Sequence, residues 1–331
     1  MLVVQFSNYG GYEMLQAVEK GIPVLADGQL LVRVTLAAVN PVDDTLRKGM
    51  IKASQLPMIP GNEAVGVVEK GNAEFPEGTR VIVSCFNTVG QVRGIYTTGA
   101  WQQYLALSPS ELIKIPEGVT DEVAAAFPVG YFSARACLNK AEFAAGKRVL
   151  ALGVGGSVGN AAVQIARAEG ASLVITTAGS SEKVAVAKSY GFDNVIDLSK
   201  ETISEGVARI TNSGGVDIVI DSIGGNLTGD AIHSLSRNGI IVVIGYSAGA
   251  TFNANITDFV WKGLQMRGQS LNGWFNKTEE IQVWNQLLPL LSAEKINPVV
   301  SKVFPAQQAA DAQRYLIEER PFGKVLINFN A

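Results

Sequence analysis

Between residues 147 and 245 the sequence alternates short, strongly apolar runs with longer amphipathic stretches. The apolar runs cover residues 148–152, 172–176, 194–197, 216–221 and 240–245. The stretches between them have helical patterns and cover residues 159–169, 181–190, 201–211 and 227–237. Continuous apolar runs indicate strands buried on both faces, and β-α alternation implies crossovers between parallel strands. The region therefore predicts an α/β fold with a doubly wound parallel sheet, to which residues 264–270 would add a sixth strand.

A glycine cluster follows the first of these strands, in the segment RVLALGVGGSVGNAAVQIAR. The spacing G-x-G-x-x-G is not met, because Val158 stands where a third glycine is expected after Gly153 and Gly155. Glycine still lets the backbone approach a pyrophosphate closely, and the N–H groups that begin the next helix attract an anion. We therefore predict cofactor contacts at Gly155, Gly156, Ser157, Val158 and Gly159. The alternative is a flexible turn that binds nothing.

The end of the second strand bears on which dinucleotide would bind. An NAD site usually has an acidic residue there for the ribose 2′-OH, but this strand runs into TTAGSS, and no carboxylate appears before Glu182. Thr177, Ser180 and Lys183 provide hydroxyls and a positive charge for a 2′-phosphate, so we predict NADPH. The alternative is that Ser180 or the serine after it only caps a helix and Lys183 is a solvated charge.

The first 120 residues have a different pattern, in which short strand-like runs are separated by glycine and proline. The candidate strands are residues 2–6, 30–37, 64–69, 80–85, 102–107 and 112–115. Many short, closely spaced strands favour an antiparallel barrel or sandwich. At Thr120 an N-cap residue followed by an Ala-rich stretch predicts the start of a helix. Residues 323–329 return to a strand pattern and are expected to rejoin this first part.

Composition excludes several classes of protein. The 331 residues carry 27 Lys and Arg against 30 Asp and Glu, a net charge of -3, so no basic field for nucleic acid exists. No apolar run is long enough for a membrane helix, and the N-terminal segment lacks the pattern of a signal peptide. Two cysteines suit a reducing compartment, so a cytoplasmic location is expected. The single histidine, His233, rules out sites built on several histidines.

Taken end to end, the chain resembles the medium-chain dehydrogenase/reductase superfamily, in its zinc-free, quinone oxidoreductase-like branch. The segments that carry the resemblance are AAVNPVDDTLRKG, IPGNEAVGVVEKG, FPEGTRV, KIPEGVTDEVAAAFPVGYFSA, the glycine-rich segment, VDIVIDSIGG, IGYSAG and FGKVLINF, in that order. The resemblance implies a GroES-like β-barrel domain over residues 1–121 and 273–331. It also implies a Rossmann cofactor-binding domain over residues 122–272, with the active cleft at the junction of the two.

The resemblance also allows the zinc positions to be compared residue by residue. Zinc-dependent relatives use a Cys before an Asp, the His of Gly-His-Glu, and a Cys or Glu before the cofactor domain. The matching positions here are Asn40, Asn62 and approximately Val129. None offers a thiolate, an imidazole or a carboxylate, and no cysteine cluster exists for a structural zinc. We therefore predict no metal, and a packing or surface role for His233.

The resemblance implies catalytic positions at Asn40 and Asp43, and cofactor contacts at Ser133 and Lys324. Tyr131 stands where relatives often have Gly, and we predict that it narrows the pocket or donates a proton. Asp221, Gly245 and Ser247 lie at the ends of predicted strands, where doubly wound sheets place ligand contacts, so we predict cofactor contacts there. Six of these residues have a structural alternative. Asn40 would shape a turn, Asp43 would cap a helix, and Asp221 would accept backbone N–H groups. Tyr131 would be a pocket wall, Ser133 would only pack within its helix, and Lys324 would be a surface lysine.

These features predict a zinc-independent, NADPH-dependent reductase of quinones or α,β-unsaturated carbonyls, small molecules that delocalise the incoming charge themselves. One alternative is an enoyl-thioester reductase, for which the basic segment LRKGMIKASQ (residues 46–55) is suggestive. The other is a cofactor-binding protein with vestigial activity. An exposed edge strand running from Leu264 to Ser270 would pair across a two-fold axis, so a homodimer is expected.

Overall fold

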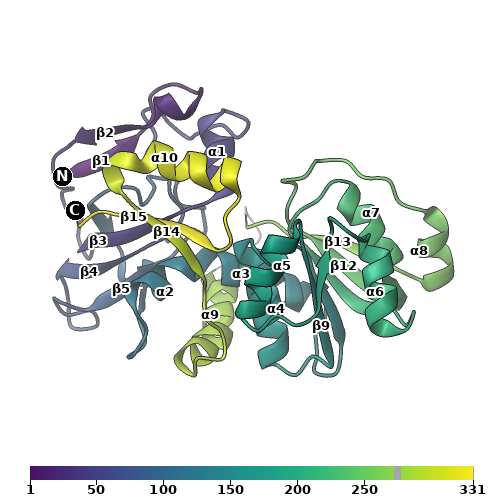
Figure 1. The fold of residues 1–331 in the computed structure, drawn as a ribbon. Helices are drawn as coiled ribbons and strands as arrows, with labels where there is room; N and C mark the ends of the chain where they lie inside the picture. The colour runs from purple at the N-terminus through teal and green to yellow at the C-terminus, as the bar shows by residue number, and fades with distance from the viewer. Residues whose placement is uncertain (272–276, 331) are drawn as a thin grey trace. The chain divides into compact units, whose positions relative to one another are not determined.

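The computed structural model describes residues 1–271 and 277–330, which divide into two compact units (Figure 1). Unit 1 comprises Met1–Val129, Leu271–Gln282 and Val299–Ala331, and unit 2 comprises Gly130–Ser270 and Val283–Pro298. The predicted limit between residues 121 and 122 differs from this division, because residues 122–129 group with unit 1. The predicted limit between residues 272 and 273 lies outside the described residues.

Leu271, predicted in the Rossmann domain, groups with unit 1, and residues 283–298, which the resemblance placed in the first domain, group with unit 2. Helix α9 (Lys277–Ser292) runs through the boundary at Gln282. Beyond that boundary Val283, Trp284, Leu287 and Leu291 are buried, and the Trp284 ring lies 5.6 Å from that of Phe132, which also belongs to unit 2. Aromatic packing of this kind holds the second half of the helix in unit 2.

Unit 1 is built on a mostly antiparallel sheet with the strand order β14-β15-β3-β4-β5-β7, in which β6 pairs with β3. The bounds are β3 (Leu30–Val39), β4 (Ala64–Lys70), β5 (Arg80–Val83), β6 (Tyr104–Leu107), β7 (Leu112–Lys114), β14 (Val300–Pro305) and β15 (Lys324–Asn328). A separate pair joins β1 (Leu2–Gln5) and β2 (Gln16–Glu19). The six strands predicted before residue 120 are thus confirmed to within a few residues, whereas β2 and β14 were not predicted.

The C-terminal strand of unit 1 forms the return that the sequence predicts. β15 pairs antiparallel with β3, with Val325 opposite Val39. Helices α1 (Pro41–Arg47), α2 (Asp121–Ala126) and α10 (Ala309–Arg314) complete this unit. Helix α2 begins at the predicted cap, where the Thr120 side chain accepts a hydrogen bond from the Val123 N–H. The tail therefore rejoins the N-terminal part of the chain, where β15 lies next to β3 in the strand order and β4 lies on the other side of β3.

Unit 2 contains a parallel sheet with the strand order β10-β9-β8-β11-β12-β13. Its strands are β8 (Arg148–Ala151), β9 (Leu173–Ala178), β10 (Val195–Asp197), β11 (Val216–Asp221), β12 (Leu235–Val243) and β13 (Gln265–Gly268). The helices are α3 (Pro128–Lys140), which starts two residues before the unit, α4 (Ser157–Ala168), α5 (Ser181–Ser189), α6 (Ile203–Thr211), α7 (Asn226–His233) and α8 (Ile256–Lys262). The order reverses between β8 and β11, so the predicted doubly wound fold is confirmed.

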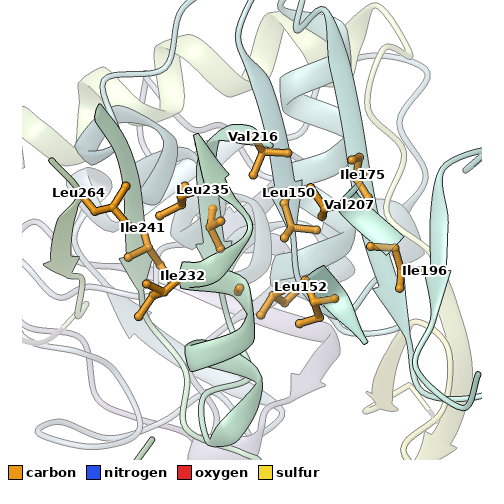
Figure 2. Packing of buried hydrophobic residues seen from close by; sticks show 13 residues of the cluster. Leu150, Leu152, Ile175, Ile196, Val207, Val216, Ile232, Leu235, Ile241 and Leu264 are labelled. Atoms are coloured by element: carbon orange, nitrogen blue, oxygen red, sulfur yellow. The ribbon is translucent and has the colours of Figure 1, made fainter. Parts of the chain in front are cut away.

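The core of unit 2 lies between this sheet and the helices that cover it (Figure 2). Leu150 and Ile175 of neighbouring strands pack in one cluster with Val207 of α6 and Ile232 of α7. All four side chains are buried. The continuous apolar runs read from the sequence are therefore the buried strands that they predicted.

One predicted helix ends at a different residue in the structure. The helical stretch over residues 227–237 stops at His233, and β12 begins at Leu235. Leu235 is buried and pairs with Val216, and the ladder then shifts register before Ile240. Asn238 takes a left-handed conformation within that shift, with φ at 60°. Burial of Leu235 in the sheet core thus ends the helix earlier than its periodicity suggests.

Across the described ranges, no helix is both long enough and apolar enough to cross a membrane.

Candidate active site

The glycine-rich turn lies between β8 and α4, at the carboxyl end of the parallel sheet. The N-cap of α4 is Gly156, which has no side chain to occupy the helix terminus. A Cβ at Gly159 would lie 2.3 Å from the Leu152 carbonyl oxygen and 2.4 Å from that of Gly153. Only glycine permits this approach of helix to strand. The first N–H groups of a helix have no acceptor within it, so those of Ser157 and Val158 suit a phosphate, and the turn fits a dinucleotide.

Thr177, at the end of β9, supports this turn. Its hydroxyl accepts a hydrogen bond from the Gly153 N–H at 2.9 Å, and its carbonyl accepts one from the Val154 N–H at 3.0 Å. Gly153 has φ at 77°, a conformation that favours glycine. The side chain of Thr177 therefore fixes the backbone that would receive a pyrophosphate.

Asp221 ends β11 and holds the neighbouring turn. Its Oδ1 accepts hydrogen bonds from the N–H groups of Ile223 and Gly224, both at 2.9 Å, and its Oδ2 accepts one from the Thr228 hydroxyl at 2.5 Å. The residue is fully buried. Its carboxylate thus has the structural use that the sequence left open as the alternative.

Gly245 and Ser247 follow β12 at the same edge of the sheet. A Cβ at Gly245 would lie 1.9 Å from the Ser222 carbonyl oxygen, so this position requires glycine. Ser247 is exposed, and its hydroxyl is 3.5 Å from the Ile223 carbonyl oxygen. The Ser222 hydroxyl donates to the Leu152 carbonyl at 3.1 Å. These contacts join the loops after β8, β11 and β12 into one surface, the place where doubly wound sheets bind ligands.

The start of α3 packs against the start of α4. A Cβ at Gly130 would lie 2.9 Å from the Cβ of Ser157. Tyr131 and Ser133 follow in α3, and both are buried within unit 2. Burial raises the pKa of Tyr131 far above its ordinary value, and a hydrogen bond with Gln164 opposes this only in part. A phenol of raised pKa is a weaker proton donor, so the environment of Tyr131 favours the alternative of a pocket wall over a catalytic acid.

The predicted ribose-phosphate residues lie at the junction of β9 and α5. The Ser180 hydroxyl accepts from the Lys183 N–H at 3.4 Å and caps α5, as the alternative proposed. The Ser181 hydroxyl donates to Asp197 Oδ2 at 2.6 Å. Asp197 ends the adjacent strand β10 and was not singled out from the sequence. A carboxylate at the end of a buried strand, in VID, is the signal that would have identified it.

In unit 1, three buried side chains form a charged cluster: Asn40, Glu63 and Lys324. The Lys324 Nζ donates to Asn40 Oδ1 at 2.6 Å and lies 2.5 Å from Glu63 Oε1. Asn40 Nδ2 donates to the same Glu63 oxygen at 2.9 Å, and the Val129 N–H donates to Glu63 Oε2 at 2.6 Å. The side chain of Lys324 is 4% exposed and that of Glu63 is 0% exposed. Lys324 is therefore not the surface lysine of the alternative prediction.

The order of the sheet explains this cluster. β15, β3 and β4 are consecutive neighbours. Lys324 begins β15, Asn40 follows the last residue of β3, and Glu63 precedes β4. Antiparallel pairing brings these three strand ends to one edge, and the Ala38 N–H donates to the Glu63 carbonyl at 3.2 Å. Glu63 was missed in the sequence because one carboxylate in GNEAVGVV has no partner within reach along the chain.

Asp43 lies beside the cluster, in the first turn of α1. Its Oδ2 accepts from the Asn40 N–H at 2.7 Å, and its Oδ1 accepts from the Gly61 N–H at 3.1 Å. Burial raises the pKa of Asp43 to about 7, although both backbone hydrogen bonds and the charge of Lys324 lower it. The contact with Asn40 is half of a capping box, so Asp43 has the helix-capping use that was its alternative.

The donors at the positions matched to zinc ligands do not suit zinc. Asn40 Oδ1 already accepts from an ammonium group, which would repel a divalent cation. Asn62 Nδ2 donates to the Arg93 carbonyl at 2.7 Å, and the side chain of Val129 has no donor atom. In the part of the chain that the structure describes, no cluster of three or more His, Cys, Asp or Glu side chains could hold a metal. His233 lies at the end of α7, with Nδ1 3.1 Å from Asp258 Oδ2.

Comparison with known proteins agrees with this architecture. The family model described as "Alcohol dehydrogenase GroES-like domain" matches residues 26–117, and the model described as "Zinc-binding dehydrogenase" matches residues 157–293. An NADPH-dependent alkenal/one oxidoreductase of Arabidopsis thaliana is 31% identical, over 97% of this chain and 78% of that protein. The words "Zinc-binding dehydrogenase" describe the family as a whole. In this chain, the residues at the matched zinc positions, Asn40, Asn62 and Val129, are not the ligands that zinc prefers.

Two solved structures illustrate the range of the fold. An NAD-dependent alcohol dehydrogenase has a TM-score of 0.89 at 27% identity, and 99% of each chain is covered. Escherichia coli quinone oxidoreductase complexed with NADPH has a TM-score of 0.85 at 27% identity, with 99% of this chain and 100% of that chain covered. The chain belongs to the medium-chain dehydrogenase/reductase superfamily, in its quinone oxidoreductase-like branch, and is an oxidoreductase.

Proposed function

We propose that this chain is a zinc-independent, NADPH-dependent reductase that transfers a hydride to quinones or α,β-unsaturated carbonyls. The observation that carries the proposal is the buried ammonium of Lys324, held by Glu63 and Asn40 where relatives present metal ligands. The names of an alkenal/one oxidoreductase and of a quinone oxidoreductase with bound NADPH among similar proteins support the substrate class and the cofactor.

Binding of the cofactor is the task of unit 2. The nicotinamide ring supplies the hydride when the dinucleotide is bound. We assign the pyrophosphate to the N–H groups at the start of α4, from Ser157 to Gly159, on the turn braced by Thr177. The Gly156 N–H donates to the Gly153 carbonyl at 2.9 Å, so Gly156 remains a proposed contact through its close backbone approach. Lys183 would meet a 2′-phosphate, and Ser133, Gly245 and Ser247 remain proposed contacts. The uncapped helix terminus and the close packing at Gly159 support this assignment.

The acceptor class follows from the donors in unit 1. Zinc stabilises the negative charge that grows on a substrate oxygen, and the residues at the matched positions do not suit zinc. A quinone or an enone spreads the incoming charge over its own conjugated system and therefore needs less help. We assign to the Lys324 ammonium the role of a fixed positive charge for that oxygen, in an interior where such charges act strongly. The hydride delivers two electrons and one proton, and the second proton comes from solvent.

The sequence argument for the enoyl-thioester alternative is weaker once the contacts of its basic segment are considered. The basic residues of segment 46–55 are engaged within unit 1: the Arg47 side chain is buried and its Nε donates to Gln313 Oε1 at 2.5 Å. Lys48 pairs with Asp44 at 2.8 Å, and Lys52 lies over the Tyr9 ring at 4.6 Å. These contacts leave less positive charge for a phosphorylated carrier than the sequence suggests.

The test is oxidation of NADPH by the purified chain with an ortho-quinone, a small enone or a 2-enoyl-CoA, before and after treatment with a chelator. We expect turnover with the quinone or the enone, no effect of the chelator, and less than stoichiometric zinc by mass spectrometry. Turnover with enoyl-CoA alone would replace the proposed acceptor. Loss of activity together with a removed metal would refute zinc independence, and binding of NADPH without any turnover would favour a vestigial activity.

A further inference from the structure

The adenosine end of the proposed cofactor site carries a negative charge that the local sequence does not reveal. Asp197 is the register partner of Ala178, so it lies directly beside the end of β9. The backbone confirms the pairing, since the Leu198 N–H donates to the Ala178 carbonyl at 2.9 Å. Ser181 Oγ, from the first turn of α5, donates to Asp197 Oδ2 at 2.6 Å. The carboxylate is thus one hydroxyl away from the loop that would receive the adenosine ribose.

The carboxylate of Asp197 is held firmly in place. Its Oδ1 accepts hydrogen bonds from the Ser199 hydroxyl at 2.5 Å and the Ser199 N–H at 3.1 Å. Lys200 Nζ lies 3.4 Å from Oδ2, but its side chain is 69% exposed, so solvent weakens that ion pair. Hydrogen bonds from Ser181 and Ser199 lower the pKa of Asp197 to about 2. The group is therefore ionised at neutral pH.

The two serine hydroxyls at this end differ in how they are engaged. The Ser180 hydroxyl accepts from the Lys183 N–H and caps α5, whereas the Ser181 hydroxyl donates its proton to Asp197. Lys183 favours a phosphate at this end, whereas the charge of Asp197 opposes one. A phosphate ester adds almost two negative charges, but the diol of an unphosphorylated ribose adds none.

We propose, on the basis of the function proposed above, that Asp197 is a specificity-determining residue that acts through Ser181 to weaken binding of the 2′-phosphate. The charge of Asp197 repels the phosphate, and the carboxylate also keeps the Ser181 hydroxyl turned away from it. The preference of this chain for NADPH over NADH is then the balance between Lys183 and Asp197, and it is smaller than Lys183 alone would give.

The experiment compares dissociation constants of NADPH and NADH, measured by the fluorescence of the reduced nicotinamide, in the wild type and in Asp197→Asn. We expect the variant to bind NADPH about three- to tenfold more tightly, the effect of removing one nearby negative charge in a partly solvated site. NADH affinity should not change. The fragments 2′-AMP and 5′-AMP should repeat this difference by calorimetry, without a nicotinamide or a turnover.

Matched variants separate charge from structure. Asp193→Asn removes the same charge from an 86% exposed side chain on the preceding loop and should leave the NADPH to NADH ratio unchanged. Asp197→Glu keeps the charge and should keep the wild-type ratio, and Asp197→Ser repeats the test if the asparagine variant does not fold. Adding Ser181→Ala to Asp197→Asn should remove the part of the gain that comes from the released hydroxyl.

The outcomes discriminate clearly. An unchanged ratio in a folded Asp197→Asn protein, or an equal change in Asp197→Glu, overturns the proposal. If the wild type binds neither dinucleotide, the proposed function fails and this inference falls with it. If both dinucleotides bind but no acceptor is reduced, the selectivity measurement still decides the role of Asp197.

Discussion

Lys324 Nζ and Asn40 Oδ1 lie 2.6 Å apart although 284 positions separate the two residues in the chain. The contact exists because β15 pairs with β3 and brings the start of one strand beside the end of the other. Glu63 completes the cluster from the edge of β4. Removing charges from water costs several kcal/mol per ion, so a buried pair of this kind gives little net stability by itself. Its retention in the fold is consistent with the use of the ammonium in the proposed reaction.

Replacing Lys324 by Met should lower both activity and stability. The loss of a fixed charge near a developing oxyanion is expected to reduce kcat by about 10²-fold. The unpaired Glu63 should cost about 3 to 5 kcal/mol of unfolding free energy. The double variant Lys324→Met with Glu63→Gln removes both charges and should recover stability but not kcat. Lys302→Met, at an exposed lysine of β14 whose Nζ lies 4.5 Å from the centre of the Phe304 ring, is the control. A double variant that regains kcat would contradict the assigned role.

Gly159→Ala should weaken binding of the dinucleotide and destabilise unit 2. The new methyl group would lie 2.3 Å from the Leu152 carbonyl, so α4 must move away from β8 and carry its N–H groups with it. We expect the dissociation constant of NADPH to rise by about tenfold or more, since each 1.4 kcal/mol is a factor of ten. Gly21→Ala, where a Cβ meets nothing within 4 Å, is the matched control. Equal affinity in both variants would argue against the turn as the pyrophosphate site.

Asp43 should make stability depend on pH. Its pKa is raised to about 7 in the folded protein, above about 3.9 in an unfolded chain. The folded state holds the Asp43 proton more tightly than the unfolded chain does. Protonation of Asp43 therefore stabilises the fold fully below pH ~4, and this stabilisation is lost as pH rises to ~7. The change amounts to about 4 kcal/mol at most. Asp43→Asn should therefore flatten unfolding free energy, from urea titrations, between these pH values; parallel curves for variant and wild type would show that Asp43 does not titrate there.

Tyr131→Phe should have little effect on turnover. The side chain is buried and its pKa is raised, so we expect it to shape the site without donating a proton. A general acid contributes about 10²- to 10⁴-fold to a rate, and kcat of the variant should stay within about threefold of the wild type. Steady-state kinetics with quinone and with enone test this. If kcat of the variant fell by about 10²-fold or more, and if no change of pH restored it, Tyr131 would again be the candidate proton donor.

The proposed homodimer should depend on the edge strand β13. Met266 on this strand is 41% exposed, and α8 beside β12 exposes Val260 and Trp261 at more than 70% each. Apolar groups at an unpaired edge favour association. We expect light scattering to give twice the mass of 35.0 kDa at micromolar concentration, and Met266→Asp to give a monomer. A monomeric wild type, or a Met266→Asp dimer, would place the interface elsewhere or remove it.

Local patterns were enough to predict the doubly wound sheet of unit 2 and most strands of unit 1, because the polarity of a strand or helix reflects its own burial. The apolar runs at residues 148–152 and 216–221 are β8 and β11 of the parallel sheet, and Thr120 caps α2 as expected. Where local signals failed, tertiary packing decided: Leu235 belongs to β12 because the sheet buries it. The second half of α9 groups with unit 2 because Trp284 packs on Phe132. Neither partner lies within reach of a sequence window.

The sequence by itself determined the residue types available for chemistry: glycines at a strand-to-helix turn, no histidine or cysteine cluster for zinc, and a lysine at the start of the last strand. Only the tertiary structure decided how these residues are used. It buries Lys324 against Glu63 and Asn40, and it commits Asp221 and Ser180 to local hydrogen bonds. It also brings Asp197 to Ser181. The physical reason is that burial and charge pairing depend on which strands become neighbours, and side chains far apart in the chain acquire their partners only when the sheets form.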